Sequence, residues 1–278
     1  MARPRHLRLC LIPALALLIA LVGPPACSRA DGPVILATTS SVANSGLLDL
    51  VLAAYRDGTV RPVLVGSGRA LEMLAAGSAD VVISHAPSRE TAALAAHPSW
   101  TYRKILYNDF LIVGPSEDPA RVADAGDAVE AMTRIAQSDA RFLSRGDESG
   151  THERERELWA LAGVEPEPGR LVVAGAGMGQ TLRVAGSTGA YTLTDRGTYE
   201  ALRESVPLRA WFEGDPRLLN TYAVIADPRN ESGAVFARWL SEGAGRDVIG
   251  GALRAGKVRG FVVWPSGVAG STPAARPH

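Results

Sequence analysis

Between residues 34 and 253 the sequence alternates short runs rich in β-branched residues with longer runs of helical periodicity. This alternation is typical of an α/β fold with mostly parallel sheets, because each helix returns the chain to the start of the next strand. We predict strands over residues 34–40, 61–68, 80–87, 104–115, 141–146, 171–177, 189–195 and 218–228. The predicted helices cover residues 45–58, 69–78, 123–138, the run after Thr151, 178–188, 196–205, 232–243 and 246–253.

The two ends of the chain are predicted to lie outside the fold. Basic residues at positions 3, 5 and 8 precede the apolar run 9–23, and small residues follow it, so residues 1–30 have the pattern of a secretory leader. The apolar run is too short to span a membrane comfortably, which disfavours an uncleaved anchor. Cleavage after Ala26 or Ala30 would export the protein to the periplasm or to the outer face of the cytoplasmic membrane. The tail 265–278, rich in Pro, Gly, Ala and Ser, is expected to be disordered.

Both cysteines, Cys10 and Cys27, lie in or beside this leader. The exported domain therefore uses neither a disulfide framework nor thiol chemistry. Cys27 follows Ala26 and stands where a bacterial lipoprotein carries its lipidated cysteine, although Pro24 differs from the usual aliphatic residue. Lipid anchoring through Cys27 and simple release both stay open.

The formal charge is balanced, with 29 basic and 29 acidic residues. No basic stripe is present that would bind nucleic acid or an anionic membrane surface, so attraction for an anion must be local. The run THERERELW at 151–159 alternates charges at helical spacing, and we predict that it is a solvent-exposed helix face.

Three predicted strands end in turns in which hydroxyl residues and glycine precede the next helix. These turns are ATTSS at 37–41, VGSG at 65–68 and LSRGDESGT at 143–151. In open α/β sheets ligands bind at the carboxyl ends of strands, where helix N-termini offer free N–H groups to anions. One such turn would be an ordinary cap, since Ser and Thr are common N-cap residues. Three of them, one with Arg145, favour a convergent oxyanion pocket.

Other site chemistries have weaker support. The five histidines are not paired at i, i+3 or i, i+4, so we expect no site for a metal cation. No G-x-S-x-G nucleophile elbow occurs. The motif GAGMGQ at 175–180 has the wrong spacing for a dinucleotide site, and we interpret it as tight helix–sheet packing with a close backbone approach. We expect no cofactor.

Several longer motifs are specific in combination: TTSSVANSGLLD (38–49), VGSGRAL (65–71), ADVVISHAP (79–87), YNDFLIVGP (107–115), SRGDESGTHERERELW (144–159), GAGMGQTL (175–182), GAYTLTDRGTY (189–199) and EGDPRLLNTYAVI (213–225). Through them the chain resembles the tungstate-binding proteins of bacterial ABC importers, a branch of the periplasmic binding proteins. The resemblance covers about Ile35 to Pro228.

The resemblance implies a two-lobed, type II-like fold with a ligand cleft between two α/β lobes. Two crossing segments are expected near Leu111–Gly114 and Asn220–Val224. The first lobe would then comprise residues 31–112 and 221–264, and the second lobe residues 113–220. It also implies a tungstate receptor that delivers its anion to a permease and an ATPase, acts without catalysis and is expected to be a monomer.

Carried over residue by residue, the family's anion-binding positions fall on the three hydroxyl turns. In this chain Ser40 and Ser67 stand where the family has threonine, so each hydroxyl is retained. The implied ligand residues are Thr38, Thr39, Ser40, Ser41, Ser67, Gly68, Arg145, Ser149, Gly150 and Thr151. A tetrahedral dianion only accepts hydrogen bonds, so a site built from donors suits it.

His85 is a candidate selectivity residue. The corresponding strand of the related phosphate receptors carries an aspartate, which accepts the proton of hydrogen phosphate and repels an anion without one. The alternative is a packed histidine at the strand end that never faces the ligand.

Two further functions stay open. Molybdate or phosphate could replace tungstate as the ligand. A secreted phosphate-ester hydrolase would need a base or nucleophile, for which Asp147 and Asp109 are candidates, although Asp147 more simply holds the turn or pairs with Arg145.

Overall fold

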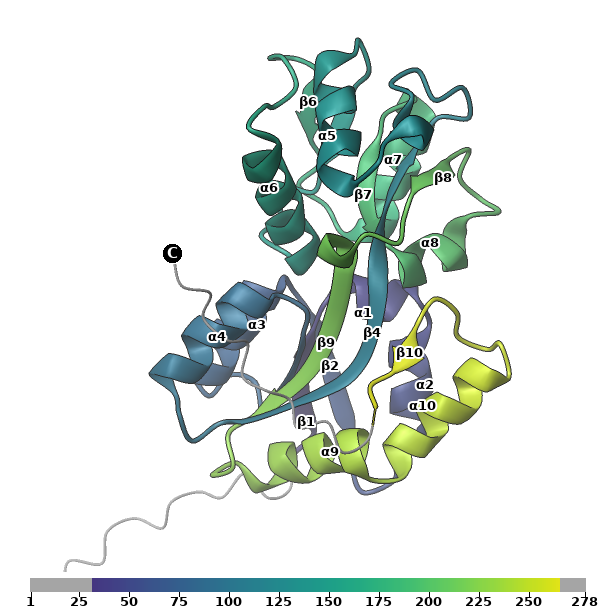
Figure 1. Cartoon of the computed structure of the whole chain (residues 1–278). Helices are drawn as coiled ribbons and strands as arrows, with labels where there is room; N and C mark the ends of the chain where they lie inside the picture. Colours follow the sequence, from purple (N-terminus) through teal and green to yellow (C-terminus); the bar gives the residue numbers. More distant parts are fainter. Residues whose placement is uncertain (1–31, 266–278) are drawn as a thin grey trace, which may run out of the picture. The chain divides into compact units, whose positions relative to one another are not determined.

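The computed structural model describes residues 32–265 (Figure 1). The predicted leader with Cys27, and the predicted tail beyond Pro265, lie outside the described residues.

The described elements alternate along the chain as the periodicity predicts. The strands are β1 (Val34–Thr38), β2 (Val60–Leu64), β3 (Val81–Ser84), β4 (Thr101–Gly114), β5 (Phe142–Ser144), β6 (Leu171–Val173), β7 (Thr192–Asp195), β8 (Arg209–Phe212), β9 (Leu219–Ala226) and β10 (Val262–Val263). The α-helices are α1 (Ser40–Asn44), α2 (Leu47–Ala54), α3 (Ser67–Ala75), α4 (Pro87–Ala96), α5 (Ala128–Gln137), α6 (Gly150–Ala162), α7 (Met178–Thr188), α8 (Arg196–Leu202), α9 (Glu231–Glu242) and α10 (Ala244–Arg254). Short 3-10 turns η1 (Val122–Asp124) and η2 (Pro216–Leu218) complete the described chain.

The α/β class is confirmed, but strand direction differs from the expectation of mostly parallel sheets. The main sheet has the order β10-β4-β9-β3-β1-β2, with β7 and β8 paired to β4, and β5 pairs β6 separately. The pairs β1–β2, β1–β3 and β5–β6 are parallel, whereas every pair that involves β4 or β9 is antiparallel. The long strand β4 carries the chain away from β1–β3 and β9 brings it back beside β4, so these two strands run in opposite directions (Figure 1).

β4 changes its partners within one residue. Residues Thr101–Asp109 pair with β9, whereas Phe110–Gly114 pair with β7 and β8. β9 starts at Leu219, directly opposite Asp109. The change of partner therefore falls just before both of the ranges expected to cross between lobes.

The buried apolar side chains follow the same division. One group of clusters, called core A, is drawn from Val34–Leu106 and from Tyr222–Phe261. The other, core B, is drawn from Phe110–Leu218. No residue of one core falls in the sequence range of the other, so β4 and β9 link two separately packed regions.

Three local differences from the predicted elements have clear causes. The predicted helix 45–58 is shortened to α2, which begins after Gly46 because this N-cap residue is in a left-handed conformation with φ 78°, and the separate short helix α1 before it was not predicted. α4 was not predicted, and it begins at Pro87, whose fixed φ suits a first helical position. β8 was not predicted either, and its pairing with the end of β4 is a long-range contact. Within residues 32–265, no helix is long and apolar enough to cross a membrane.

Candidate functional site

Polar contacts join both the first hydroxyl turn and Arg145 to the start of α7. The Met178 N–H donates to Ser40 Oγ over 3.2 Å. The Arg145 guanidinium donates through Nε to the carbonyl oxygen of Ala176 (3.0 Å) and through Nη1 to Sδ of Met178 (3.1 Å). The turn after β1, the N-terminus of α7 and the end of β5 therefore meet at one place, although they are far apart in sequence.

Close backbone packing joins the remaining turns. An added Cβ on Gly66 would lie 3.1 Å from the Asp147 carbonyl oxygen, and one on Gly150 would overlap the carbonyl group of His85. The His85 N–H donates to Ser67 Oγ over 3.3 Å. The turn after β5 thus contacts both the turn after β2 and the turn after β3. The N–H of Val65 donates to the Thr38 carbonyl oxygen over 2.8 Å, which joins the turns after β1 and β2. The turns after β1, β2, β3 and β5 and the start of α7 are called here the turn ring, and every residue predicted to bind the anion lies in one of these turns or at the start of the helix that follows it.

The turn after β5 is held by its own short-range bonds. Ser149 is the N-cap of α6, and its Oγ accepts from the His152 N–H over 3.3 Å. The Ser149 N–H donates to Asp147 Oδ1 over 3.2 Å, and the other Asp147 oxygen pairs with the Arg145 guanidinium. The interpretation that Asp147 pairs with Arg145 is therefore confirmed.

Several polar atoms of the turn ring are buried without a partner. Among the described residues, Thr38 Oγ1, Thr39 Oγ1, Thr151 Oγ1 and His85 Nε2 have no hydrogen-bond partner and almost no exposed surface. A buried polar group left unpaired costs about 1–3 kcal/mol, so native proteins rarely gather such groups without a reason. A ligand with several acceptors would satisfy the three hydroxyls.

Of the other predicted ligand residues, Ser40, Ser67 and Ser149 have hydroxyl groups that accept backbone N–H bonds. Ser41 is buried in α1, and Ser67 and Gly68 are buried in the first turn of α3. The Arg89 side chain covers Gly68, where an added Cβ would lie 2.5 Å from Nη1.

Arg145 is the buried cation of the turn ring, with 1% of its side chain exposed. Its bonds to Ala176, Met178 and Asp147 use three of its five N–H groups, which leaves two for a ligand. The backbone N–H of Arg145 donates to Glu155 Oε2 over 3.2 Å, and burial raises the pKa of the Glu155 carboxyl to about 7.

His85 is almost fully buried and lies beside β9. Its ring stacks on Tyr222 with centroids 4.9 Å apart, and Nδ1 lies 3.2 Å from Asn220 Oδ1. Burial lowers the pKa of the His85 imidazole to about 4, although the charge of Asp195 acts in the raising direction. The imidazole is therefore neutral near pH 7.

Asp195 was not singled out from the sequence. Its buried carboxylate is the N-cap of α8 and accepts from the N–H and from the hydroxyl of Thr198, both over 2.8 Å. An aspartate at a strand end, directly before a helix, is a readable N-cap signal. Its charge influences both His85 and Tyr222, which places it near the turn ring.

The prediction that the run 151–159 is a solvent-exposed helix face is wrong, because Arg156 is its one exposed residue. Glu155 is buried, and Glu153 Oε1 accepts from the Ser88 N–H of α4 over 3.2 Å. The spacing of the charged residues predicts a helix, but it does not predict which of the acidic residues is buried. The close backbone approach predicted for GAGMGQ is confirmed, since an added Cβ on Gly177 would lie 3.0 Å from Ser40 Oγ, but its partner is helix α1 and not a strand.

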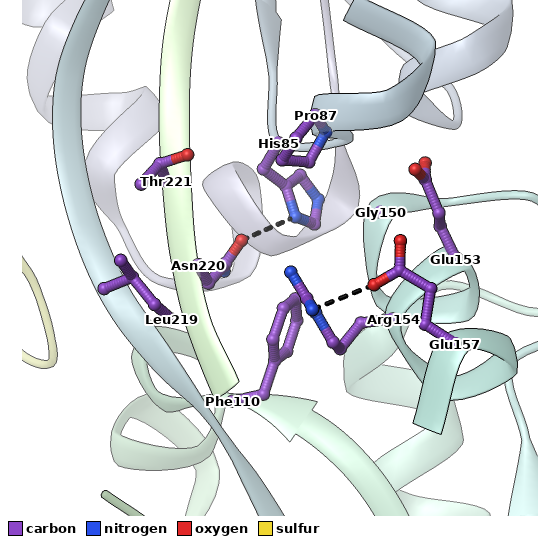
Figure 2. A pocket seen from close by; sticks show the side chains of 10 residues that line it. All are labelled: His85, Pro87, Phe110, Gly150, Glu153, Arg154, Glu157, Leu219, Asn220 and Thr221. Carbon is purple, nitrogen blue, oxygen red and sulfur yellow. Dashed lines mark hydrogen bonds and ion pairs between the residues drawn. The ribbon is translucent and has the colours of Figure 1, made fainter. Parts of the chain in front are cut away.

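Figure 2 shows a pocket beside the turn ring, with His85 and Asn220 on one side and the start of α6 on the other. It is lined by His85, Pro87, Phe110, Gly150, Glu153, Arg154, Glu157, Leu219, Asn220 and Thr221. Only His85 and Gly150 belong to the predicted site residues. Arg154 and Glu157 pair across 2.8 Å, so the pocket carries little free charge (Figure 2). Between residues 32 and 265 no group of three or more His, Cys, Asp or Glu side chains could hold a metal cation.

Residues 25–242 match the family model described as the PBP superfamily domain. The chain is 38% identical over 235 residues to the tungstate-binding protein TupA of Peptoclostridium acidaminophilum, and the match covers 80% of this chain and 82% of that protein. It is 34% identical over 216 residues to the tungstate-binding protein TupA of Campylobacter jejuni, covering 72% of this chain and 80% of that protein.

A solved structure shares the same arrangement. The tungstate ABC transporter structure from Geobacter sulfurreducens is 37% identical, with a TM-score of 0.69, and the match covers 79% of this chain and 98% of that chain. The chain therefore belongs to the PBP superfamily, within the family that includes the tungstate-binding TupA proteins.

Proposed function

We propose that the protein is an extracytoplasmic receptor that captures tungstate between two lobes and delivers it to an ABC importer. The observation that carries the proposal is the set of unpartnered, buried hydroxyls of Thr38, Thr39 and Thr151 in the same ring of turns as Arg145. The TupA relatives, which are named for tungstate binding, support the choice of ligand.

The chemistry of the turn ring suits a tetrahedral dianion. Hydroxyls and helix N-terminal N–H groups donate, and the Arg145 guanidinium adds a fixed positive charge. In a closed site of low polarity these donors act more strongly than they would in water. We propose as ligand residues Thr38, Thr39, Ser40, Ser41, Ser67, Gly68, Arg145, Ser149, Gly150 and Thr151.

The proposal includes two lobes that close on the ligand. We place the first lobe at 31–112 and 221–264 and the second at 113–220. The separate cores A and B support this division, as does the change of partner within β4. Because the turn ring draws on both sets of residues, closure would complete the site.

We also propose that the protein binds without catalysis. The carboxylates that a hydrolase would use are engaged elsewhere: Asp147 pairs with Arg145, and Asp109 receives two bonds from Arg196 at 2.5 and 2.7 Å. Incubation with a chromogenic phosphate ester tests this, and turnover above the blank would count for an enzyme.

The partners and location follow from the same proposal. A permease and an ATPase would receive the anion, and the receptor would act as an exported monomer. Cys27→Ser tests the lipid anchor: a lipidated protein moves from the membrane fraction to the soluble fraction after this change, whereas a released protein does not.

Calorimetric titration with tungstate, molybdate, sulfate and phosphate tests the ligand. We expect tungstate to bind tightly and sulfate and phosphate to bind weakly. Molybdate has nearly the same size and charge as tungstate, so its ratio to tungstate measures how finely the site discriminates. Tight phosphate binding with no response to tungstate would contradict the proposal.

A further inference from the structure

The hydrogen bonds around Asn220 fix the protonation pattern of His85. The Asn220 Nδ2 group donates to Asn108 Oδ1 (2.8 Å) and to the Tyr222 hydroxyl (2.9 Å). Both of its N–H bonds are then used, so the atom that meets His85 Nδ1 at 3.2 Å is the amide oxygen. An amide oxygen only accepts, and therefore Nδ1 carries the proton. In the neutral imidazole, Nε2 is left as a lone-pair acceptor.

This acceptor is buried next to two of the turns that carry predicted ligand residues. Nε2 has no hydrogen-bond partner among the described residues. The His85 backbone lies between two of the predicted ligand turns, because its N–H donates to Ser67 Oγ and its carbonyl packs against Gly150. A lone pair at this position would repel an anion that itself only accepts.

The fixed charges near His85 leave a deficit of positive charge for a dianion. Arg145 at the end of β5, Asp147 in the following turn and Asp195 at the start of α8 all act on the imidazole. Arg145 and Asp147 pair with each other, so the Asp195 carboxylate is not balanced within this group. On the pocket side of His85, the groups are Glu153, Arg154 and Glu157, of which the last two pair. A bound dianion would add two further negative charges.

Protonation of His85 would turn Nε2 from an acceptor into a donor, and it would also add the positive charge that a bound dianion lacks. Burial and the nearby charge of Arg145 favour the neutral ring of His85. A dianion held by Arg145 lies within the same electrostatic range, carries twice the charge of Arg145 and has the opposite sign. It therefore favours the imidazolium, in which Nε2–H is a donor.

We propose that His85 takes up one proton from the solvent when a fully deprotonated oxyanion such as tungstate binds, and so becomes a second positive charge beside Arg145. This inference rests on the proposed function. An anion that brings its own proton, such as hydrogen phosphate, would instead donate to the neutral Nε2 and would need no uptake. His85 thus links the protonation state of the ligand to that of the site.

The test is calorimetric titration of the wild-type protein with tungstate in two buffers of different ionisation enthalpy at about pH 7.5. We expect the binding enthalpies to differ by an amount that corresponds to nearly one proton taken up. We also expect the Kd to rise about tenfold per pH unit between about pH 6 and 8. Tight binding with equal enthalpies in both buffers would overturn the His85 inference and leave the receptor function intact. Absence of binding would overturn both.

Variants identify the group that takes the proton. His85→Gln cannot titrate, so proton uptake should disappear and the Kd should become independent of pH. Glu155→Gln is the matched control, because Glu155 is another buried group and its pKa of about 7 lies within the pH range of the titrations. Uptake should survive in Glu155→Gln. Uptake that persists in His85→Gln and disappears in Glu155→Gln would overturn the assignment. If His85→Gln does not fold, loss of uptake in Glu155→Gln is enough to overturn it.

Discussion

Two strand-end turns of the molecule share one construction but present different side chains. After β5, the N–H of Arg145 donates to Glu155 of α6 over 3.2 Å. After β3, the N–H of Ala86, the neighbour of His85, donates to Glu90 of α4 over 2.9 Å. In each case a buried carboxyl on the following helix holds the backbone of the turn. The plan of the turn is therefore the same on both sides of the turn ring.

The difference lies in the ionisable side chain that each turn carries. Arg145 is always charged, because a guanidinium does not lose its proton in a protein. His85 is neutral, because burial lowers its pKa to about 4. One turn thus supplies a permanent charge and the other an adjustable one, while the two glutamates have a structural role. Changes to the side chains should affect anion binding, and changes to the glutamates should chiefly affect stability.

The largest effect is expected from Arg145→Ala. Loss of the buried cation should weaken tungstate binding by about 4 kcal/mol, roughly 1000-fold, because the anion loses its fixed positive charge while Asp147 is left unpaired beside it. Arg145→Lys should keep part of the affinity, since it preserves the charge but not the planar fork. Calorimetric titration of folded protein measures both.

The matched control is Arg134→Ala, which removes an arginine paired with Glu130 on the surface of α5 and should leave the Kd unchanged. Near-native binding by folded Arg145→Ala would show that Arg145 only anchors the turn through Asp147. If Arg145 only anchors the turn, Arg145→Ala should lower the melting temperature and leave the Kd unchanged.

The second prediction concerns His85→Asp. A carboxylate at this position joins Asp147 and Asp195 near the anion, and a buried like charge repels a dianion. We expect tungstate affinity to fall about 100-fold near neutral pH, whereas His85→Gln should retain binding. Affinity that is unchanged in folded His85→Asp would assign His85 a purely structural role.

The third prediction concerns Gly150, where the two turns touch. A methyl group at this position would overlap the His85 carbonyl, so Gly150→Ala should separate the turns and weaken tungstate binding about tenfold. Gly251→Ala in α10 is the control, because nothing lies within 4 Å of the added Cβ. Titration of both variants should show a changed Kd for Gly150→Ala alone. Equal affinities would mean that the contact is absent when the anion is bound.

Much of the fold and the grouping of the site were predictable from local sequence patterns. Alternating periodicities predicted the α/β class, and the repeated turn composition drew attention to the same turns that meet around Arg145. The start of α2 after Gly46 and the start of α4 at Pro87 also have local signals, a glycine and a proline, that a finer interpretation could use.

The parts that could not be predicted depend on contacts between distant segments. The direction of β4 relative to β9 follows from the crossing between the cores, which no local pattern records. Glu155 and Glu90 resemble ordinary surface residues of charged helices, and their burial arises only when each helix packs under a strand end. Charge is visible in a sequence, but the environment of that charge is not.

The smallest effects on binding, and a distinct effect on stability, are expected from Glu155→Gln and Glu90→Gln. Burial raises the pKa of Glu155 from 4.5 to about 7 and that of Glu90 from 4.5 to about 6. At pH values between the ordinary and the raised pKa, the carboxyl keeps its proton in the folded state and has lost it in the unfolded state. The free energy of unfolding is therefore highest below about pH 4.5 and falls as the pH rises through the folded pKa. Glutamine cannot ionise and should remove this loss.

Relative to wild type, the variants should gain stability between about pH 5 and 8, by about 3 kcal/mol for Glu155→Gln and about 2 kcal/mol for Glu90→Gln. Urea unfolding at several pH values measures the difference, in which the contribution of His85 cancels because all the proteins retain it. Glutamine oxygen can still accept from the turn N–H, so tungstate affinity should change little. Alanine at either position lacks this acceptor and should destabilise the protein at every pH. A stability difference that does not vary with pH would show that the two carboxyls are ionised in the folded protein. Ionised carboxylates would then accept the backbone N–H bonds of the two turns, and the interpretation that both turns are held by neutral carboxyls would be wrong.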